Sequence, residues 1–403
     1  MFNTILSLGT VLIIGLFGAR IFSKISLPSV TAYIVFGIIL GPYVLNFVSP
    51  DMLRSSALIS TIALSLVAFS LGQNFTISKL HNIGKSIFAI SIGEVLGSFI
   101  LVSLAVFLIA RQSLSIALIL GAIAPATAPA AVVMVTREYR ARGRFTDTLL
   151  GVVAIDDAWS IMLFAFCIAI AKSLTGAHTG IFATIFSDII HGFWEVLGGL
   201  ALGVIIGFIF SYFLKYINTL PHLLIYILGL IFINTGASIL LNVSLLLANM
   251  ALGATVANKV KMSENIFDVL RGFDPPIYLL FFILAGANLE IPSIYSLSIL
   301  GILYVLTRLP GEMLGAFIGA HIAKADKNIK KYLGLGLAPQ AGVAIGLALL
   351  TKSYFPGAIG DKILSTIIVT TIIYELIGPF LVRIALKKAG EIDKLPHDYR
   401  KVQ

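Results

Sequence analysis

Two adjacent carboxylates stand out in the sequence, because Asp156 and Asp157 lie in the apolar stretch GVVAIDDAWSIMLF. A charged residue at the centre of a membrane-spanning helix costs about 2.5–3.5 kcal/mol, so such a pair needs a reason. Neighbouring helical residues point about 100° apart, so one carboxylate can face a helix interface while the other faces a cavity. In a low dielectric both cannot ionise cheaply. The pair therefore predicts a site for protons or for a small hard cation such as Na⁺, with Asp156 and Asp157 as oxygen ligands.

A second signal is the segment LILGAIAPATAPAAVVMV, which has Pro125 and Pro129 in its middle. Proline lacks a backbone donor and clashes with the preceding turn, so two prolines four residues apart predict an interrupted helix. Broken backbone within a membrane is tolerated only where it is buried or lines a polar cavity. The freed carbonyls and the hydroxyl of Thr127 are then candidate cation ligands.

A third signal is GLGLAPQAGVAIGLALL, which predicts a second interrupted helix at Pro339 and Gln340. It follows the first by seven predicted spans, and this odd offset means that the two run through the membrane in opposite directions. Two broken helices at corresponding places in two halves indicate a transporter with inverted repeats and a binding site near the membrane midplane.

Five other charged residues lie in apolar spans. Arg308 and Glu312 are four residues apart on one helix face, so they are expected to neutralise each other. The alternative is that Arg308 reaches one of the two aspartates. Glu375 is interpreted as a further structural ion-pair partner of Arg308. Glu94 and Glu195 are expected to face polar interiors, without an assigned role.

The composition shows what must position these residues. Of the 403 residues, 58% are hydrophobic and 12% are charged, whereas soluble proteins have about 25% charged residues, so a soluble enzyme is excluded. The single cysteine excludes an intrachain disulfide. With about 20 apolar residues per span, we predict an all-α polytopic membrane protein of about 13 transmembrane helices. The spans run approximately over residues 2–21, 28–48, 55–72, 86–110, 114–135, 147–172, 188–214, 222–238, 242–258, 275–290, 295–321, 331–352 and 361–387.

The basic residues indicate the orientation, because Lys and Arg are retained in cytoplasmic loops. With this set of spans, 22 of the 28 Lys and Arg residues fall on one side, 5 fall on the other and Arg308 lies within a span. The N-terminus is therefore predicted outside and the C-terminus in the cytoplasm. Segment 136–146 (TREYRARGRFT) is interpreted as a cytoplasmic loop, and no nucleic-acid partner is expected.

Other chemistries find no support in the sequence. No GxxxxGK[ST] phosphate loop and no zinc-ligand spacing occur, so neither an enzyme nor a cofactor is predicted. Connections between spans are short, which predicts one membrane domain over residues 1–403 without a soluble domain. Because no organelle-targeting segment is visible, the plasma membrane of a prokaryote is the expected location.

In these residues the chain resembles the monovalent cation:proton antiporter superfamily, on the side of NapA-type sodium/proton antiporters and Kef-like exchangers. The similarity covers nearly the whole chain. It is carried by ISLPSVTAYIVFGIILGP near the start, APATAPAA, the aspartate pair, LAGANLE at 284–290, LAPQAGVAIGLA and YELIGP.

The resemblance implies a sodium/proton antiporter fold, in which two broken helices cross in a core that moves like an elevator against a dimer domain. Dimer-type helices would be at about 1–72 and 222–290, a linker helix at about 188–214, and core-type helices at about 86–172 and 295–387. It also implies a homodimer in lipid. Asp157 would be the principal ligand shared by cation and proton, Asp156 its partner and Thr127 a neighbour, with Pro125, Pro129, Pro339 and Gln340 supporting the broken helices.

One position departs from the family pattern. Electrogenic members have a lysine in the eleventh helix in a pattern like GKxxGA, and the aligned stretch here is GEMLGA with Glu312 in that place. Arg308, one turn away, is the candidate substitute. The transport stoichiometry is therefore left open between electrogenic and electroneutral.

The sequence thus predicts a secondary antiporter that exchanges Na⁺, or Li⁺ or K⁺, for H⁺, with the two ions competing for the aspartate pair. A Kef-like potassium/proton exchanger and a sodium-coupled symporter of organic solutes are the alternatives. An intramembrane aspartyl protease is disfavoured, because its two carboxylates must face each other from separate helices.

Overall fold

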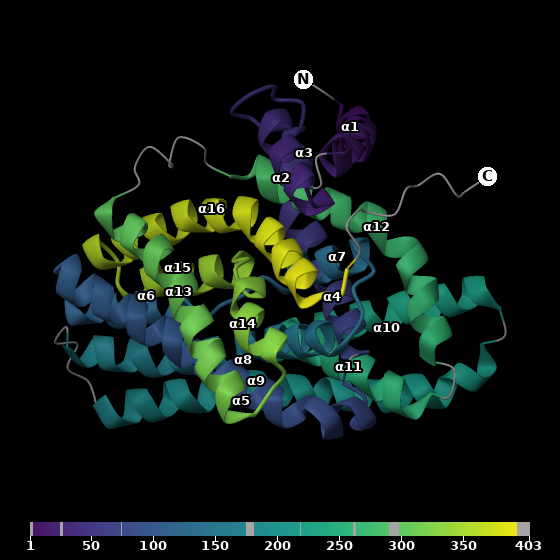
Figure 1. Cartoon of the computed structure of the whole chain (residues 1–403). Coiled ribbons are helices and arrows are strands. Elements are labelled where there is room, and N and C mark those ends of the chain that lie inside the picture. Colours follow the sequence, from purple (N-terminus) through teal and green to yellow (C-terminus); the bar gives the residue numbers. More distant parts are fainter. Residues whose placement is uncertain are drawn as a thin grey trace.

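The computed structural model describes residues 3–24, 27–73, 75–174, 181–217, 219–260, 263–289 and 298–392. Over these ranges the chain forms helices and no strand, as predicted (Figure 1). The elements are α1 (Thr4–Lys24), α2 (Ser29–Leu40), α3 (Pro50–Arg54), α4 (Ser56–Gly72), α5 (Ile77–Leu104), the π-helix η1 (Ala105–Ile109), α6 (Leu114–Ile123), α7 (Pro129–Glu138), α8 (Arg144–Leu174), α9 (Ile181–Phe213), the 3₁₀-helix η2 (Leu214–Tyr216), α10 (Leu220–Leu240), α11 (Leu245–Lys259), α12 (Ser263–Ala287), α13 (Ile299–Ile322), α14 (Lys327–Gly336), α15 (Gly342–Tyr354) and α16 (Ala358–Ala389).

Every predicted span coincides with one of these helices or with a broken pair of them. The pairs are α6–α7 and α14–α15, and α3 is a short additional helix. In the described part of the chain, 8 helices are long and apolar enough to cross a membrane, and α2, α4, α6 and α15 are shorter apolar helices. The protein is therefore a multi-pass membrane protein, while the count of about 13 spans stays a prediction.

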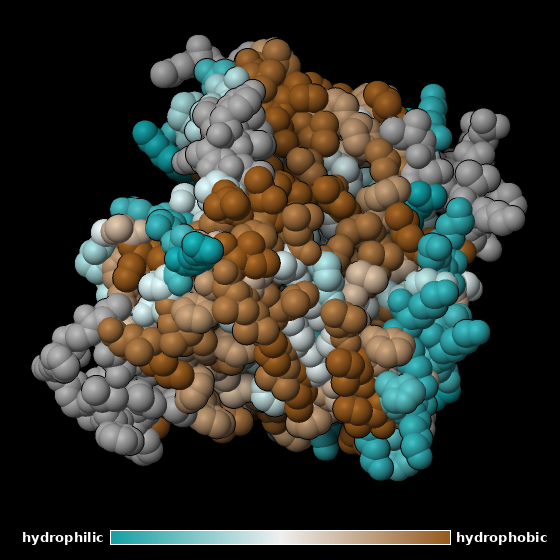
Figure 2. Space-filling model, turned by 60° about the vertical axis from the view of Figure 1, so that its left-hand side comes forward, coloured by the Kyte–Doolittle hydropathy of each residue, from teal (hydrophilic) through white to brown (hydrophobic). Residues whose placement is uncertain are grey.

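The outer surface differs from that of a soluble protein, because it exposes many large apolar side chains. Large apolar side chains such as Leu16, Ile225 and Leu306 are exposed. Figure 2 shows a broad apolar surface on one face, with hydrophilic residues gathered towards its edges. By contrast, Glu94 and Arg308 are 0% exposed. The apolar outer surface faces lipid, and the charged groups within need partners in the protein.

Glycines bring α5 and α13 unusually close together. A Cβ atom on Gly315 would lie 2.0 Å from the carbonyl oxygen of Gly93, and one on Gly97 would lie 2.4 Å from that of Gly311. Small residues at such crossings allow membrane helices to pack backbone against backbone. This contact places Glu94 of α5 beside the charged residues of α13.

The last helix supports the second broken pair. Helix α16 packs against both α14 and α15, and Figure 1 shows it (yellow) passing across them. A Cβ atom on Gly378 would lie 2.6 Å from the Cα of Pro339. The glycine of the YELIGP motif therefore makes room for the break at Pro339.

Candidate functional site

The two adjacent aspartates of α8 face different surroundings. Asp156 is 0% exposed and lies among helices, whereas Asp157 is 4% exposed and lines a cavity of about 630 Å³. Oδ1 of Asp157 has no hydrogen-bond partner among the described residues, whereas the carboxylate of Asp156 meets the side chains of Glu94 and Thr127. The division predicted from helix geometry, with one carboxylate at a helix interface and the other at a cavity, is what the structure has.

The cavity at Asp157, which we call the acidic cavity, is mostly apolar. Its walls come from α4, α8, α9, α15 and the start of α11. Its charged lining residues are Asp157 and Glu195, with no Lys or Arg among the described lining residues. A small cation that enters it therefore meets negative charge and little competing polar surface.

Asp156 belongs to a buried cluster. The groups that act on it electrostatically are Glu94, Asp157, Thr127 and Arg308. Both carboxylate oxygens of Glu94 also lack a hydrogen-bond partner in the described part of the chain. Glu94 was recognised in the sequence as a charged residue within a span, but its place beside Asp156 was not predicted.

The two predicted helix breaks are present and contact each other. Helix α6 ends at Ile123 and α7 begins at Pro129, while residues 337–341 separate α14 from α15. The backbone N–H of Ala128 donates to the carbonyl of Pro339 over 2.8 Å. The Thr127 hydroxyl donates to the carbonyls of Pro125 (3.2 Å) and Leu337 (3.5 Å). Thr127 therefore lies in the contact between the two breaks, and its role as a cation ligand stays a prediction.

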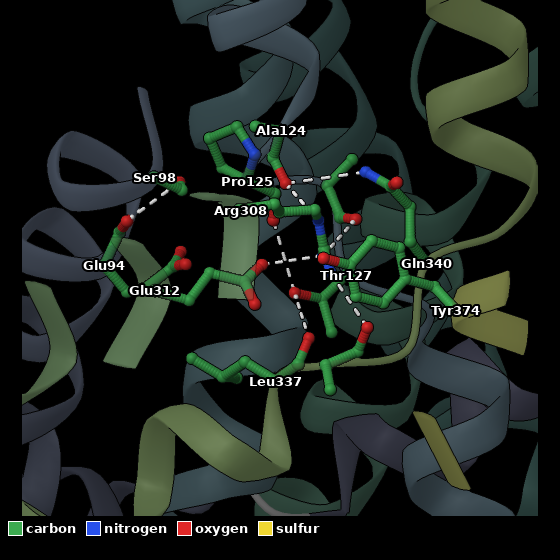
Figure 3. A network of polar contacts seen from close by, with 12 residues as sticks. Glu94, Ser98, Ala124, Pro125, Thr127, Arg308, Glu312, Leu337, Gln340 and Tyr374 are labelled. Carbon is green, nitrogen blue, oxygen red and sulfur yellow. Dashed lines mark hydrogen bonds and ion pairs between the residues drawn. The ribbon is translucent and has the colours of Figure 1, made fainter. Parts of the chain in front are cut away.

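Arg308 joins both broken helices through their free carbonyls (Figure 3). Its Nε donates to Ala124 O over 2.7 Å, its Nη1 to Ala338 O over 2.8 Å and its Nη2 to Ala126 O over 3.3 Å. The last carbonyls of a helix have no partner within it and form the negative end of its dipole. The guanidinium satisfies and neutralises the C-terminal ends of α6 and α14 together.

The same arginine forms the predicted ion pair with Glu312. Arg308 Nη2 lies 2.6 Å from Glu312 Oε1, and both side chains are 0% exposed. The ring of Tyr374 lies 4.5 Å from the guanidinium. The predicted ion pair between Arg308 and Glu375 is wrong: Glu375 Oε2 has no partner among the described residues. Tyr374 occupies the face towards Arg308, and the next residue on a helix points about 100° away.

Gln340 is placed in the same network. Its Nε2 donates to the hydroxyl of Tyr304 over 3.0 Å and to the carbonyls of Ile123 (3.4 Å) and Ala124 (3.5 Å). It thereby links the second break to the C-terminal end of α6. The sequence contained no signal for Tyr304 or Tyr374, because a tyrosine in an apolar span is also an ordinary core residue.

The arrangement contains more acid than base. Glu94, Asp156 and Glu312 lie near Arg308, Asp157 is next to Asp156 in the chain, and all four carboxylates are at most 4% exposed. In the described part of the chain no three His, Cys, Asp or Glu side chains are grouped closely enough to hold a metal ion. The oxygen groups beside Asp156 are the carboxylate of Glu94 and the hydroxyl of Thr127. Such oxygens can hold a hard cation, and the surplus of carboxylates can hold protons.

Comparisons with known proteins agree with this fold. A family model described as "Sodium/hydrogen exchanger, transmembrane" matches residues 9–388. Two solved structures of the sodium proton antiporter MjNhaP1 from Methanocaldococcus jannaschii are similar: one at pH 8, with a TM-score of 0.69, and one described by an electron-microscopy map, with a TM-score of 0.72. In both cases the identity is 20%, and the match covers 95% of this chain and 94% of the other. A search of curated proteins found no match.

Proposed function

The chain belongs to the sodium/hydrogen exchanger family, and from that premise we propose that it exchanges Na⁺, or Li⁺ or K⁺, for H⁺ at Asp157 and Asp156. It is a multi-pass membrane transporter and not an enzyme. One observation carries the proposed site: Asp157 stands at the wall of the acidic cavity, while the adjacent Asp156 belongs to the buried cluster. Cation and proton compete for the same carboxylate oxygens, so binding of one releases the other.

Arg308 has a supporting role in this proposal. It compensates the negative ends of α6 and α14 and the charge of Glu312, which leaves the charge of the aspartates to the transported ions. Because Arg308 and Glu312 neutralise each other, the lysine that electrogenic family members have in the place of Glu312 is not needed for this pairing. Whether net charge moves in each cycle is decided by the experiment below.

We propose alternating access by an elevator-like movement of core-type helices against dimer-type helices. The acidic cavity supports it, since α8 and α15 form one wall of this cavity and α4 and the start of α11 form the other. At the opposite end of the same interface, Arg137 of α7 binds Asp274 of α12 over 2.6 Å. With the N-terminus outside, as the basic loops predict, the acidic cavity opens outwards. A homodimer in a prokaryotic plasma membrane completes the proposal.

The lining of the acidic cavity favours a small cation over an organic acid. Its charged groups are acidic, and an organic acid would need a positive or multiply hydrogen-bonding partner that the described lining does not offer. This observation favours an antiporter over a symporter. A potassium/proton exchanger would need the same acidic lining. The test below therefore measures directly which cation is transported.

The test is exchange by proteoliposomes that contain a pH dye and carry an imposed pH gradient. Na⁺, Li⁺ and K⁺ are added in turn, with and without a potassium/valinomycin clamp. We expect cation-dependent dissipation by the wild type and none by Asp157→Asn, because the amide neither binds the proton nor neutralises the cation. Asp51→Asn, at an exposed carboxylate, is the matched control. An active Asp157→Asn protein with an unchanged apparent affinity refutes the assignment of the site.

A further inference from the structure

A second cavity lies on the face of the molecule that has most of the basic loops. Its volume is about 590 Å³, and we call it the basic cavity. Helices α2, α4 and α12 line one part of it, and α7, the α7–α8 turn and the start of α8 line the other. Its charged lining residues are Arg137, Arg140, Arg142, Arg271, Glu138 and Asp274.

Several of these charges are already used within the protein. Arg137 pairs with Asp274, and Arg271 pairs with Asp268 over 2.6 Å. The carboxylate of Glu138 accepts hydrogen bonds from the N–H (2.8 Å) and the hydroxyl (2.8 Å) of Ser29. Burial is the largest influence on Glu138 and raises the pKa of this carboxyl above its ordinary value. The two acids of the cavity are therefore engaged.

Arg140 and Arg142 are the surplus positive groups. Both are exposed and project from the turn between α7 and α8, where Arg140 has a left-handed φ of 50°. The turn is held by Glu391, whose carboxylate accepts from the N–H groups of Phe145 (2.8 Å) and Thr146 (2.7 Å). The two guanidinium groups are thus presented by an anchored segment.

An unpartnered hydroxyl lines the same cavity. Thr146 is 3% exposed, and its Oγ1 has no hydrogen-bond partner among the described residues. A buried hydroxyl without a partner is costly, and a bound group with oxygen acceptors would satisfy it. Guanidinium groups match phosphate oxygens in geometry and charge.

We propose that the basic cavity binds a phosphate group through Arg140, Arg142 and the hydroxyl of Thr146. The group belongs either to a soluble phosphate or to the headgroup of an anionic lipid in the adjacent leaflet. The three groups lie on the α7–α8 side, and α2, α4 and α12 line the rest of the same cavity, so a phosphate group bound there stands between the two sets of helices. Under the proposed elevator movement, a bound phosphate group opposes their separation and slows exchange.

The test measures thermal unfolding of the full-length protein, so its result does not depend on transport. Inorganic phosphate is titrated in detergent at ionic strength matched with choline chloride, and nanodiscs of phosphatidylglycerol are compared with nanodiscs of phosphatidylcholine. We expect a saturable rise in Tm, with apparent affinity weakened by about 10- to 100-fold in R140Q/R142Q and about tenfold in Thr146→Val. K327Q/K331Q removes the same charge from the same face outside the cavity and should behave as the wild type.

The results distinguish the two sources of the phosphate group. A rise with inorganic phosphate identifies a soluble ligand, and a rise only with phosphatidylglycerol identifies a lipid. The proposal is overturned by the absence of a saturable rise with either probe, or by equal responses of the wild type, R140Q/R142Q and Thr146→Val. Exchange is then measured in the proteoliposome assay with the same probe. A rise in Tm without slower exchange would support the phosphate site and would show that the site does not act on the elevator movement.

Discussion

The acidic and the basic cavity are both lined by α4 and α8, and they differ in charge and in whether they reach the aspartates. The acidic cavity reaches Asp157 and has carboxylates as its charged lining. The basic cavity has four arginines among its lining residues and does not reach the aspartates. At the basic end the pair Arg137–Asp274 and the contact of Glu138 with Ser29 join α7 to α12 and α2. Under the proposed alternating access, this difference is expected of a transporter that rests at one end of its cycle.

The largest expected effect comes from the network around Arg308. In Arg308→Gln the buried Glu312 loses its ion-pair partner, and the carbonyls of Ala124, Ala126 and Ala338 lose a charged donor. Breaking one partner of a buried ion pair costs about 3–5 kcal/mol. We expect a large fall in Tm and loss of exchange.

The matched control for this variant is the double variant Arg308→Gln/Glu312→Gln, which removes both charges and should recover part of the Tm. Wild-type stability of Arg308→Gln would mean that the junction of the two broken helices does not depend on this residue.

A smaller effect is expected at the closed end. Asp274→Asn removes the charge that holds Arg137 across the helix interface. The readout is a cysteine that replaces Ser70, which lines the basic cavity, in a Cys167→Ala background. With Asp274→Asn this cysteine should react with a membrane-impermeant maleimide about tenfold faster than without it, because one charge-assisted contact is lost. Asp268→Asn, on the same helix at an exposed pair, is the control. Equal labelling rates in the two variants would show that the pair does not keep this end closed.

The smallest effect is expected at the wall of the acidic cavity. Glu195→Gln removes a half-exposed carboxylate that attracts cations towards Asp157. The apparent KM for the external cation should rise about two- to threefold at low ionic strength and approach the wild-type value in high choline chloride, since salt screens such charges. The maximal rate should not change. Glu264→Gln is the control, and a changed maximal rate with an unchanged KM would contradict this role.

Local chemistry allowed part of the site to be predicted. The breaks at Pro125, Pro129 and Pro339 follow from a missing donor and a steric clash within one turn, and the pair Arg308–Glu312 follows from a spacing of four residues on one helix. The orientation of Asp156 and Asp157 towards different surroundings follows from the angle between neighbouring helical residues. Each of these depends on a few consecutive residues.

Contacts between distant spans were beyond this reasoning. The spans are apolar on nearly every face, so hydropathy does not show which face of a membrane helix is turned inwards. For that reason Glu94 was not placed beside Asp156, and Glu375 was wrongly paired with Arg308. Arg137 and Asp274, which lie far apart in the sequence, gave no sign of their contact.

The sequence by itself determined that this is a helical membrane protein with two interrupted helices and an acidic pair in its interior, because the cost of charge and proline in a membrane span is a local property. The tertiary structure decided that one arginine compensates both breaks, that Asp157 rather than Asp156 faces a cavity, and that charge differs between the two ends of one interface. The physical reason is that these features depend on the rotation and close approach of helices. Glycines such as Gly93 and Gly315 allow that approach, and only the packed chain shows which helices they bring together.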